Sequence, residues 1–200
     1  LARRLAAAGH VVLVPDLAGT GESAADLASA RWEDWVAELM AAVDHARGAG
    51  AQRICLWGLR LGCLLATDVA HLLPLPPDQL LLWQPVHKGA QQMAQFLRLL
   101  TAAGVTGSKA GVPTAAEAKA GLQRGGVVEV AGYALPGGLY DDICASDLGV
   151  MSIPPGLRIT LFEVVASAER PLSAVTQRQC EAWQSRGVAC EAETVLGDPF

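Results

Sequence analysis

The chain has 200 residues, 52% of them hydrophobic, and its 20 acidic and 15 basic side chains give a formal net charge of −5 at pH 7. This length fits one domain with a sizeable apolar core. The acidic balance and the lack of a basic block argue against nucleic acid or an anionic membrane surface as a partner.

The cysteine count and the lengths of the apolar runs bear on the cellular compartment of the protein. There are five cysteines, an odd number, and none form a C-x-x-C pair, which favours reduced and mostly buried thiols. No apolar run approaches the ~18 residues of a membrane helix, and no signal peptide is visible. We therefore expect a cytoplasmic protein. Because the chain begins inside a helical pattern without an initial Met, we also expect an internal fragment of a longer protein.

Apolar strands and helical patterns alternate through the first part of the chain. In chain order they are a helix over residues 1–8, the strand VVLVPDL (11–17), the Gly-rich turn AGTGES (18–23), a helix over 32–47 with one apolar face, the strand RICLWG (53–58), a helix over 61–72 and the buried strand QLLLWQPV (79–86).

This alternation stops after residue 86. Residues 87–155 are long, Gly-rich and mixed, and they predict a helix over 91–100, a loop over 103–114, a short strand over 127–133 and a helix within 136–148. An ordinary connection is much shorter, so we interpret this segment as an inserted cap or lid. The alternation resumes with a strand over 157–165, a helix over 176–186 and a strand over 188–195.

Continuous apolar strands separated by helices predict an α/β fold whose parallel sheet is covered on both faces. The expected organisation is a single domain over residues 1–200. Its core comprises residues 1–86 and 156–200, and the lid comprises residues 87–155.

One five-residue motif points to chemistry. Gly58-Leu59-Arg60-Leu61-Gly62 stands between a strand and a helix, which is the layout of a nucleophile elbow, G-x-S-x-G. The two glycines permit close packing of the strand on the helix. The central residue is arginine, which stays protonated and cannot form an acyl-enzyme.

The order of these segments resembles the α/β-hydrolase superfamily. VVLVPDLAGTGES is similar to the fourth strand and its turn, RICLWGLRLG to the fifth strand and elbow, QLLLWQPV to the sixth strand, and LRITLFEVV and VACEAETV to the seventh and eighth. The resemblance implies an α/β-hydrolase fold, a mostly parallel sheet flanked by helices, with a lid insertion and without the first strands. Since the third strand separates the fourth from the fifth in that family, VVLVPDL and RICLWG are not expected to pair.

A narrower resemblance lies in LWGLRLG and AGYALPGGLYDDICASDL. These segments are similar to the hydrolase 2 proteins associated with the exosortase A system. That resemblance implies a cytoplasmic bacterial protein encoded with exopolysaccharide and protein-sorting genes.

The resemblance also implies roles for single residues. The backbone N–H of Leu61 would supply half of an oxyanion hole. Glu169 follows the seventh strand, so it is either a triad-like acid or an ordinary loop residue, and a triad histidine would lie beyond Phe200. His87 follows the sixth strand and is either a substrate contact or a plain loop histidine.

Arg60 allows more than one interpretation. It could bind a carboxylate or phosphate of a substrate as a bidentate fork. It could instead be structural, paired with a local acid such as Asp16 or Glu169. If the motif is out of register, Cys63 is the rival nucleophile, although its place inside the following helix favours a packed thiol.

The remaining polar residues favour structural roles. AGTGES lacks the lysine of a phosphate-binding loop, Asp16 is expected to serve the turn, and Ser23 is expected to cap a helix. His10, His45 and His71 are expected in solvent or away from the site. No spacing suits a metal, and we expect no cofactor.

Besides a hydrolase that activates water with a carboxylate or histidine, which no residue specifically favours, two functions therefore stay open. One is a hydrolase acting on an ester, amide or similar acyl bond of a small-molecule or glycan-related substrate. The other is a non-catalytic binding or regulatory protein linked to exopolysaccharide production or export.

Overall fold

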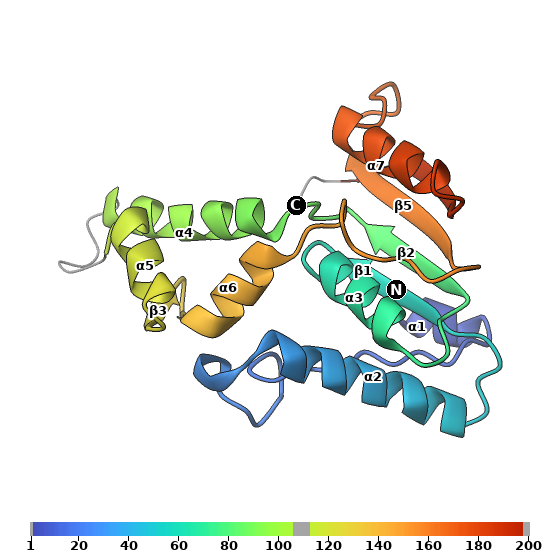
Figure 1. The fold of residues 1–200 in the computed structure, drawn as a ribbon, viewed down its shortest axis with the longest axis horizontal. Coiled ribbons are helices and arrows are strands. Elements are labelled where there is room, and N and C mark those ends of the chain that lie inside the picture. The colour runs from blue at the N-terminus through green and yellow to red at the C-terminus, as the bar shows by residue number, and fades with distance from the viewer. Residues whose placement is uncertain (1, 106–112, 198–200) are drawn as a thin grey trace. The chain divides into compact units, whose positions relative to one another are not determined.

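The computed structural model describes residues 2–105 and 113–197. The chain divides into two compact units, whose helices and strands are labelled in Figure 1. The sheet unit comprises Leu1–Val14, Leu39–His87 and Asp147–Phe200, and the helical unit comprises Pro15–Glu38 and Lys88–Ser146. Helix α2 (Trp32–Gly48) contributes residues to both.

The sheet unit contains a four-stranded parallel sheet in the order β1-β2-β5-β6. Its strands are β1 (Cys55–Leu59), β2 (Gln79–Trp83), β5 (Arg158–Val165) and β6 (Ala189–Leu196). All three pairings are parallel, so the carboxyl ends of the strands share one edge of the sheet. The expected parallel α/β architecture is confirmed.

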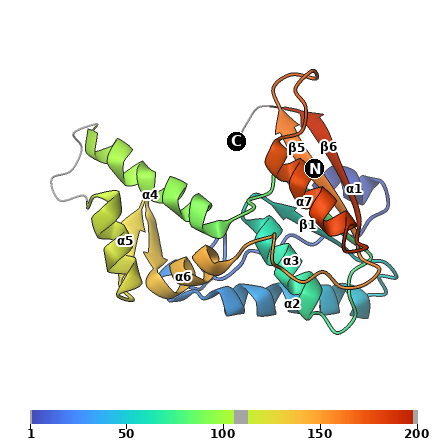
Figure 2. The same ribbon diagram turned by 45° about the horizontal axis from the view of Figure 1, so that its top comes forward.

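Helices α3 (Gly62–Leu72) and α7 (Ala174–Gln184) connect successive strands and cover one face of this sheet (Figure 2). Side chains on that face of β2 and β5, such as Leu80, Leu82 and Leu161, are fully buried. The period of two along each strand explains the pattern, because every second side chain points to the helices.

The opposite face carries a row of stacked aromatic rings. Trp57 on β1 stacks on Trp83 of β2 with ring centroids 5.6 Å apart, and Trp83 contacts Phe162 of β5 at 5.3 Å. Trp57 keeps 36% of its surface exposed, and Leu59 keeps 49%. This face is therefore apolar but only partly covered by the described residues.

The strand predicted over residues 11–17 is not formed. Helix α1 (Ala2–Ala7) ends as expected, but the VVLVPDL segment has no regular secondary structure. A strand is stable only when its N–H and C=O groups pair with a neighbour, and Val11 and Val14 each remain 74% exposed. The prediction was wrong because the apolar pattern reports the tendency to form a strand and not the presence of a partner.

Besides the first part of α2, the described residues of the helical unit form a 3₁₀ turn, three further helices and a hairpin. Its elements are the 3₁₀ turn η1 (Leu27–Ser29), α4 (Gly89–Val105), α5 (Ala115–Gln123), β3 (Val127–Val130), β4 (Tyr133–Pro136) and α6 (Gly137–Ala145). The single strand expected over 127–133 is an antiparallel hairpin, whose two turn residues, Ala131 and Gly132, both have positive φ as tight hairpins require. The loop expected over 103–114 is corrected at its start, because α4 extends to Val105; residues 106–112 lie outside the described residues.

Two glycines bring the three helices of this unit into close contact. A Cβ at Gly89, the first residue of α4, would lie 1.7 Å from the carbonyl oxygen of Ile143 on α6. A Cβ at Gly137, the first residue of α6, would lie 2.2 Å from the carbonyl oxygen of Leu122 on α5. Both helix starts are therefore fixed by backbone contacts that no larger residue permits. The single domain with a lid over 87–155 stays a prediction, because the division observed places residues 15–38 with 88–146.

Candidate functional site: the elbow after strand β1

The turn between β1 and α3 has the backbone conformation of an elbow. Arg60 adopts a φ of 53°, in the left-handed region that costs a non-glycine residue about 1–2 kcal/mol. Its N–H donates to the carbonyl of Trp83 at 3.0 Å, and its carbonyl accepts from the N–H groups of Cys63 at 3.1 Å and Val86 at 3.3 Å. Residue 60 is thus held at the carboxyl edge of the sheet by backbone bonds to the end of β2 and the start of α3.

The two flanking glycines differ in their steric roles. A Cβ at Gly58 would lie 2.5 Å from the carbonyl oxygen of Gly62 and 2.6 Å from the Cα of Cys63. A Cβ at Gly62 would meet nothing within 4 Å. The expectation that both glycines are needed for close packing is therefore corrected, because only Gly58 is required.

Leu61 directly follows the strained residue and is the N-cap of α3. Its backbone N–H therefore lies at the positive end of the helix dipole, where a negative charge is stabilised. This position suits the oxyanion-hole role expected for Leu61, which stays a prediction.

The environment of Cys63 does not suit a nucleophile. Its side chain is fully buried, and its Sγ lies 3.3 Å from the carbonyl oxygen of Gly58 and 3.6 Å from that of Trp83. Burial raises the pKa of the thiol to about 12, although backbone hydrogen bonds and the charge of Arg60 act in the opposite direction. Since the thiolate is the nucleophilic form, Cys63 is unreactive at neutral pH.

Gln84 is a residue at this edge that the sequence reasoning missed. It follows β2 with a φ of 47°, its N–H donates to the carbonyl of Phe162 at 2.6 Å, and its Oε1 accepts from the N–H of Val164 at 2.6 Å. Gln84 therefore ties the ends of β2 and β5 together next to the elbow. A polar residue between an apolar strand and Pro85 was the available signal.

His87 belongs to a network of polar side chains near the carboxyl ends of β2 and β5. Its Nε2 lies 3.4 Å from the Oγ1 of Thr176, which lies 3.1 Å from the Oγ of Ser173. Ser173 donates in turn to the buried carboxylate of Glu163 at 2.8 Å. These contacts join His87, Thr176, Ser173 and Glu163 into one polar network.

The environment of His87 disfavours its charged form. Burial lowers the pKa of the imidazole, although the carboxylates of Glu163 and Asp147 act in the opposite direction. Its Nδ1 is buried without a hydrogen-bond partner among the described residues. The imidazole of His87 is therefore neutral near pH 7, and its role as a substrate contact stays a prediction.

The carboxylate expected from the sequence, Glu169, lies on an exposed part of the loop after β5. It accepts a hydrogen bond from the Ser167 hydroxyl, and this bond, with its own backbone N–H, lowers the pKa of Glu169. The structure connects Glu163, not Glu169, to His87. Glu163 was missed because a buried acid within a strand is recognisable only by its tertiary partner, the N-cap Ser173 of α7.

The Gly-rich turn AGTGES lies in the helical unit and has a structural arrangement. Asp16 accepts a hydrogen bond from the N–H of Glu22 at 3.1 Å, and its carboxylate occupies the space where a side chain at Gly21 would lie. Ser23 does not cap a helix, which corrects that expectation. Its Oγ accepts from Ala25 at 3.4 Å, whereas Asp26 caps η1. The pairing of Arg60 with Asp16 or Glu169 stays a prediction.

Other groups in the described part of the chain add little to the site. His10, His45 and His71 are exposed. Residues 2–105 and 113–197 contain no cluster of three or more histidine, cysteine or acidic side chains that could hold a metal ion. Within the same residues, no helix has both the length and the apolar character needed to cross a membrane.

A parallel sheet with a strained strand–turn–helix elbow at its carboxyl edge defines the α/β-hydrolase class. A family model described as serine aminopeptidase, S33 matches residues 1–120, more than half of the chain, and the chain belongs to this α/β-hydrolase family. No curated protein gives a significant sequence match.

Solved structures show the same fold at low sequence identity. Est1E from Butyrivibrio proteoclasticus, with ferulic acid bound, matches 92% of this chain at 16% identity and a TM-score of 0.58, and this chain covers 66% of Est1E. A chain from the structural work on LipS and LipT, two metagenome-derived lipolytic enzymes, matches 98% of this chain at 18% identity and a TM-score of 0.56, and this chain covers 76% of it. A variant of tomato methylketone synthase I with β-ketoheptanoate gives 98% and 81% coverage, 14% identity and a TM-score of 0.57.

Proposed function

We propose that this protein binds a carboxylate-bearing small molecule at its elbow through Arg60 and does not carry out serine-based acyl transfer. The observation that carries the proposal is the backbone of Arg60, which has a φ of 53° at the position that the fold gives to a nucleophile. An elbow presents its central side chain away from the strand–helix packing, and here that side chain is a guanidinium.

The chemistry of this side chain favours binding over catalysis. A guanidinium is charged at any physiological pH and pairs with a carboxylate through two parallel hydrogen bonds. The N–H groups at the start of α3 add a positive dipole beside it. The neighbouring thiol of Cys63 is buried and protonated, so it does not restore a covalent mechanism.

Two carboxylic acids suggest suitable probes. Est1E is described with ferulic acid, and the methylketone synthase with β-ketoheptanoate. Those proteins share the fold with this chain, and the acids present one carboxylate on an aromatic and on an aliphatic body. We propose a ligand of this class, with one carboxylate and an apolar remainder.

Isothermal titration of the full chain with ferulate and β-ketoheptanoate tests the binding role. Arg60→Ser should weaken the Kd about 10- to 100-fold, because a hydrogen bond to a charged group contributes about 1.5–3 kcal/mol. Arg53→Ser is the matched control, since Arg53 is exposed just before the opposite end of β1. Equal Kd values for the wild type and Arg60→Ser would overturn the proposal.

Hydrolysis of short-chain p-nitrophenyl esters tests the competing acyl hydrolase. We expect no turnover from the wild type. Turnover that survives Arg60→Ala would show that catalysis uses other residues and would refute the non-catalytic role. Turnover that appears only in Arg60→Ser would show that the scaffold still supports acyl transfer once a hydroxyl is present, which agrees with the proposal.

A cellular role is suggested by two segments that resemble exosortase A system-associated hydrolases, LWGLRLG and AGYALPGGLYDDICASDL. We propose that the protein acts in the bacterial cytoplasm in exopolysaccharide production or export. Deleting its gene in the bacterium that encodes it should lower the yield of exopolysaccharide, and reintroducing Arg60→Ser should not restore it. An unchanged yield after deletion would contradict this role.

A further inference from the structure

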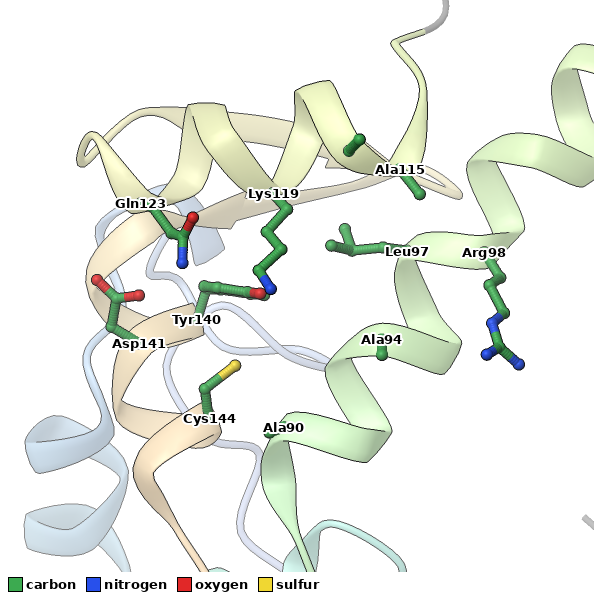
Figure 3. A pocket seen from close by; sticks show the side chains of 11 residues that line it. Ala90, Ala94, Leu97, Arg98, Ala115, Lys119, Gln123, Tyr140, Asp141 and Cys144 are labelled. Atoms are coloured by element: carbon green, nitrogen blue, oxygen red, sulfur yellow. The ribbon is translucent and has the colours of Figure 1, made fainter.

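A pocket of about 410 Å³ lies within the helical unit, among α4, α5 and α6 (Figure 3). This volume lies at the lower end of the range of about 300–1,000 Å³ found for small-molecule sites. All of its lining residues belong to the helical unit. The pocket is therefore a feature separate from the elbow, and nothing in the proposed function uses it.

The pocket exists because small side chains stand where the three helices meet. Ala90 and Ala94 are one turn apart on α4, and Ala115 and Ala116 begin α5. Methyl groups at i and i+4 leave a gap between helices that larger side chains would fill. The backbone contacts at the starts of α4 and α6 hold the helices in place and prevent them from closing this gap.

Most polar groups of the pocket come from α5 and α6, and Arg98 adds one from α4. The hydroxyl of Tyr140, a residue only 5% exposed, is hydrogen-bonded to the thiol of Cys144 one turn further along α6. The ammonium of Lys119 extends from α5 into the same space and acts electrostatically on Cys144 (Figure 3). The cation of Lys119 and the buried hydroxyl of Tyr140 thus lie in a pocket whose lining also includes Leu97 and four alanines.

The protonation states of these groups favour an anionic guest. Burial, together with the bond to Cys144, raises the pKa of Tyr140 to about 12, so the hydroxyl keeps its proton near pH 7, and a guest carboxylate would compete for that proton with the weak acceptor Cys144. Burial also raises the pKa of Cys144, which keeps the thiol uncharged. With Lys119 and Arg98 against the single carboxylate of Asp141, the charged lining side chains sum to +1.

The remaining lining decides between classes of anion. Leu97 and the alanines make much of the wall apolar, which disfavours a sugar or a nucleotide, whose many polar groups need partners. One carboxylate is too few for a hard cation, which takes several oxygen ligands. An aliphatic chain ending in one carboxylate matches both the apolar wall and the positive polar end.

We propose that the pocket among α4, α5 and α6 binds a short aliphatic carboxylate, with its charged end at Lys119 and Tyr140 and its chain along Ala94 and Leu97. This inference goes beyond the ligand site at Arg60 and does not depend on it. The helical unit would then hold an acyl acid, whether or not the elbow holds one.

Isothermal titration of octanoate into the full chain carrying Arg60→Met, whose elbow lacks the guanidinium, tests the proposal. Lys119→Met removes the ammonium and keeps an unbranched apolar side chain, and it should weaken the octanoate Kd at least about tenfold. Arg124→Met is the matched control, because Arg124 is an exposed cation at the end of α5 outside the lining. An unchanged Kd in Lys119→Met, or an equal loss in Arg124→Met, would overturn the proposal.

A second variant tests the apolar part of the pocket without touching a charge. Ala94→Phe fills the space, and because Ala94 is exposed on α4, the variant should fold and show a wild-type circular dichroism spectrum. Combined with Arg60→Met, which removes the guanidinium of the elbow, it should abolish octanoate binding, whereas a retained Kd in this folded double variant would refute the pocket.

Arg60→Met separates this site from the elbow. Octanoate bound in the helical unit should survive Arg60→Met unchanged, even if the variant has lost ferulate. Loss of octanoate in Arg60→Met together with its retention in Lys119→Met would place the acid at the elbow and refute the second site. Failure of ferulate binding alone would refute the elbow proposal and leave this one standing.

Discussion

The most specific prediction from the structure concerns the two glycines of the elbow. A methyl group at Gly58 would approach the carbonyl oxygen of Gly62 at 2.5 Å and the Cα and N of Cys63 at 2.6 and 2.7 Å, whereas ordinary contacts begin at 3.4 Å. All three atoms belong to the backbone, so no side-chain rotation relieves the overlap. Strand β1 and helix α3 would have to separate by about 1 Å along a fully buried contact.

We expect Gly58→Ala to lower the free energy of unfolding by about 3 kcal/mol, the upper end of the range for overpacked cores. Gly62→Ala is the control, because its methyl group would meet nothing within 4 Å and alanine is the better helix former. That variant should be neutral or more stable by up to about 1 kcal/mol. The two glycine-to-alanine changes should therefore alter the free energy of unfolding in opposite directions or by very different amounts.

Urea unfolding followed by tryptophan fluorescence and circular dichroism measures both effects. With an m-value of about 2 kcal/mol/M, Gly58→Ala should lower the midpoint by about 1.5 M, and Gly62→Ala should leave it unchanged or raise it slightly. Equal midpoints for the two variants would refute the close approach of β1 to α3. So would a loss below about 1 kcal/mol for Gly58→Ala, the lower limit for an overpacked core.

Three other outcomes follow from the groups around the elbow. Ser173→Ala should destabilise the protein by about 2 kcal/mol in urea, because it removes a helix cap and a hydrogen bond to a buried carboxylate, while Ser185→Ala on the exposed end of α7 should have little effect. Burial lowers the pKa of His87, so the unfolded chain binds this proton more readily, and stability should fall as the pH decreases below about 6.5; His87→Gln should flatten the fall between pH 7 and 5, and an identical slope would contradict it. Mass spectrometry after iodoacetamide treatment at pH 7.5 should find Cys63 unmodified in the native protein and modified after unfolding in urea, and rapid native labelling would show that its thiol is not buried as described.

Strands and helices with a strong local pattern were predictable from the sequence. β2 and β5 are the two central strands of the parallel sheet, so their largely apolar sequences were sufficient to predict them as strands. Residues 11–17 carry an equally strong pattern and form no strand, because a strand also needs a neighbour with free N–H and C=O groups. Helix α5 was missed, although Thr114 and Glu117 form a capping box whose T-x-x-E spacing is visible in the sequence.

The place of the motif in the fold was predictable from the sequence, whereas the catalytic and binding roles of its residues stay predictions. The motif placed Arg60 on the turn after β1, where the structure also has it. The unequal roles of Gly58 and Gly62 could not be predicted, since they depend on the angle between strand and helix. The link from Glu163 through Ser173 to His87 joins residues 76 positions apart along the sequence, and only tertiary structure brings such groups together.

The hydrogen bonds that hold the elbow use only the main chain of residue 60. Its N–H donates to the Trp83 carbonyl and its own carbonyl accepts from Val86, and these bonds are available to any residue other than proline. The conformation of the turn therefore does not depend on hydrogen bonds from the side chain at residue 60. A single substitution could therefore exchange one side chain for another at residue 60 without rebuilding the turn, so the chemistry at this position can change while the fold stays the same.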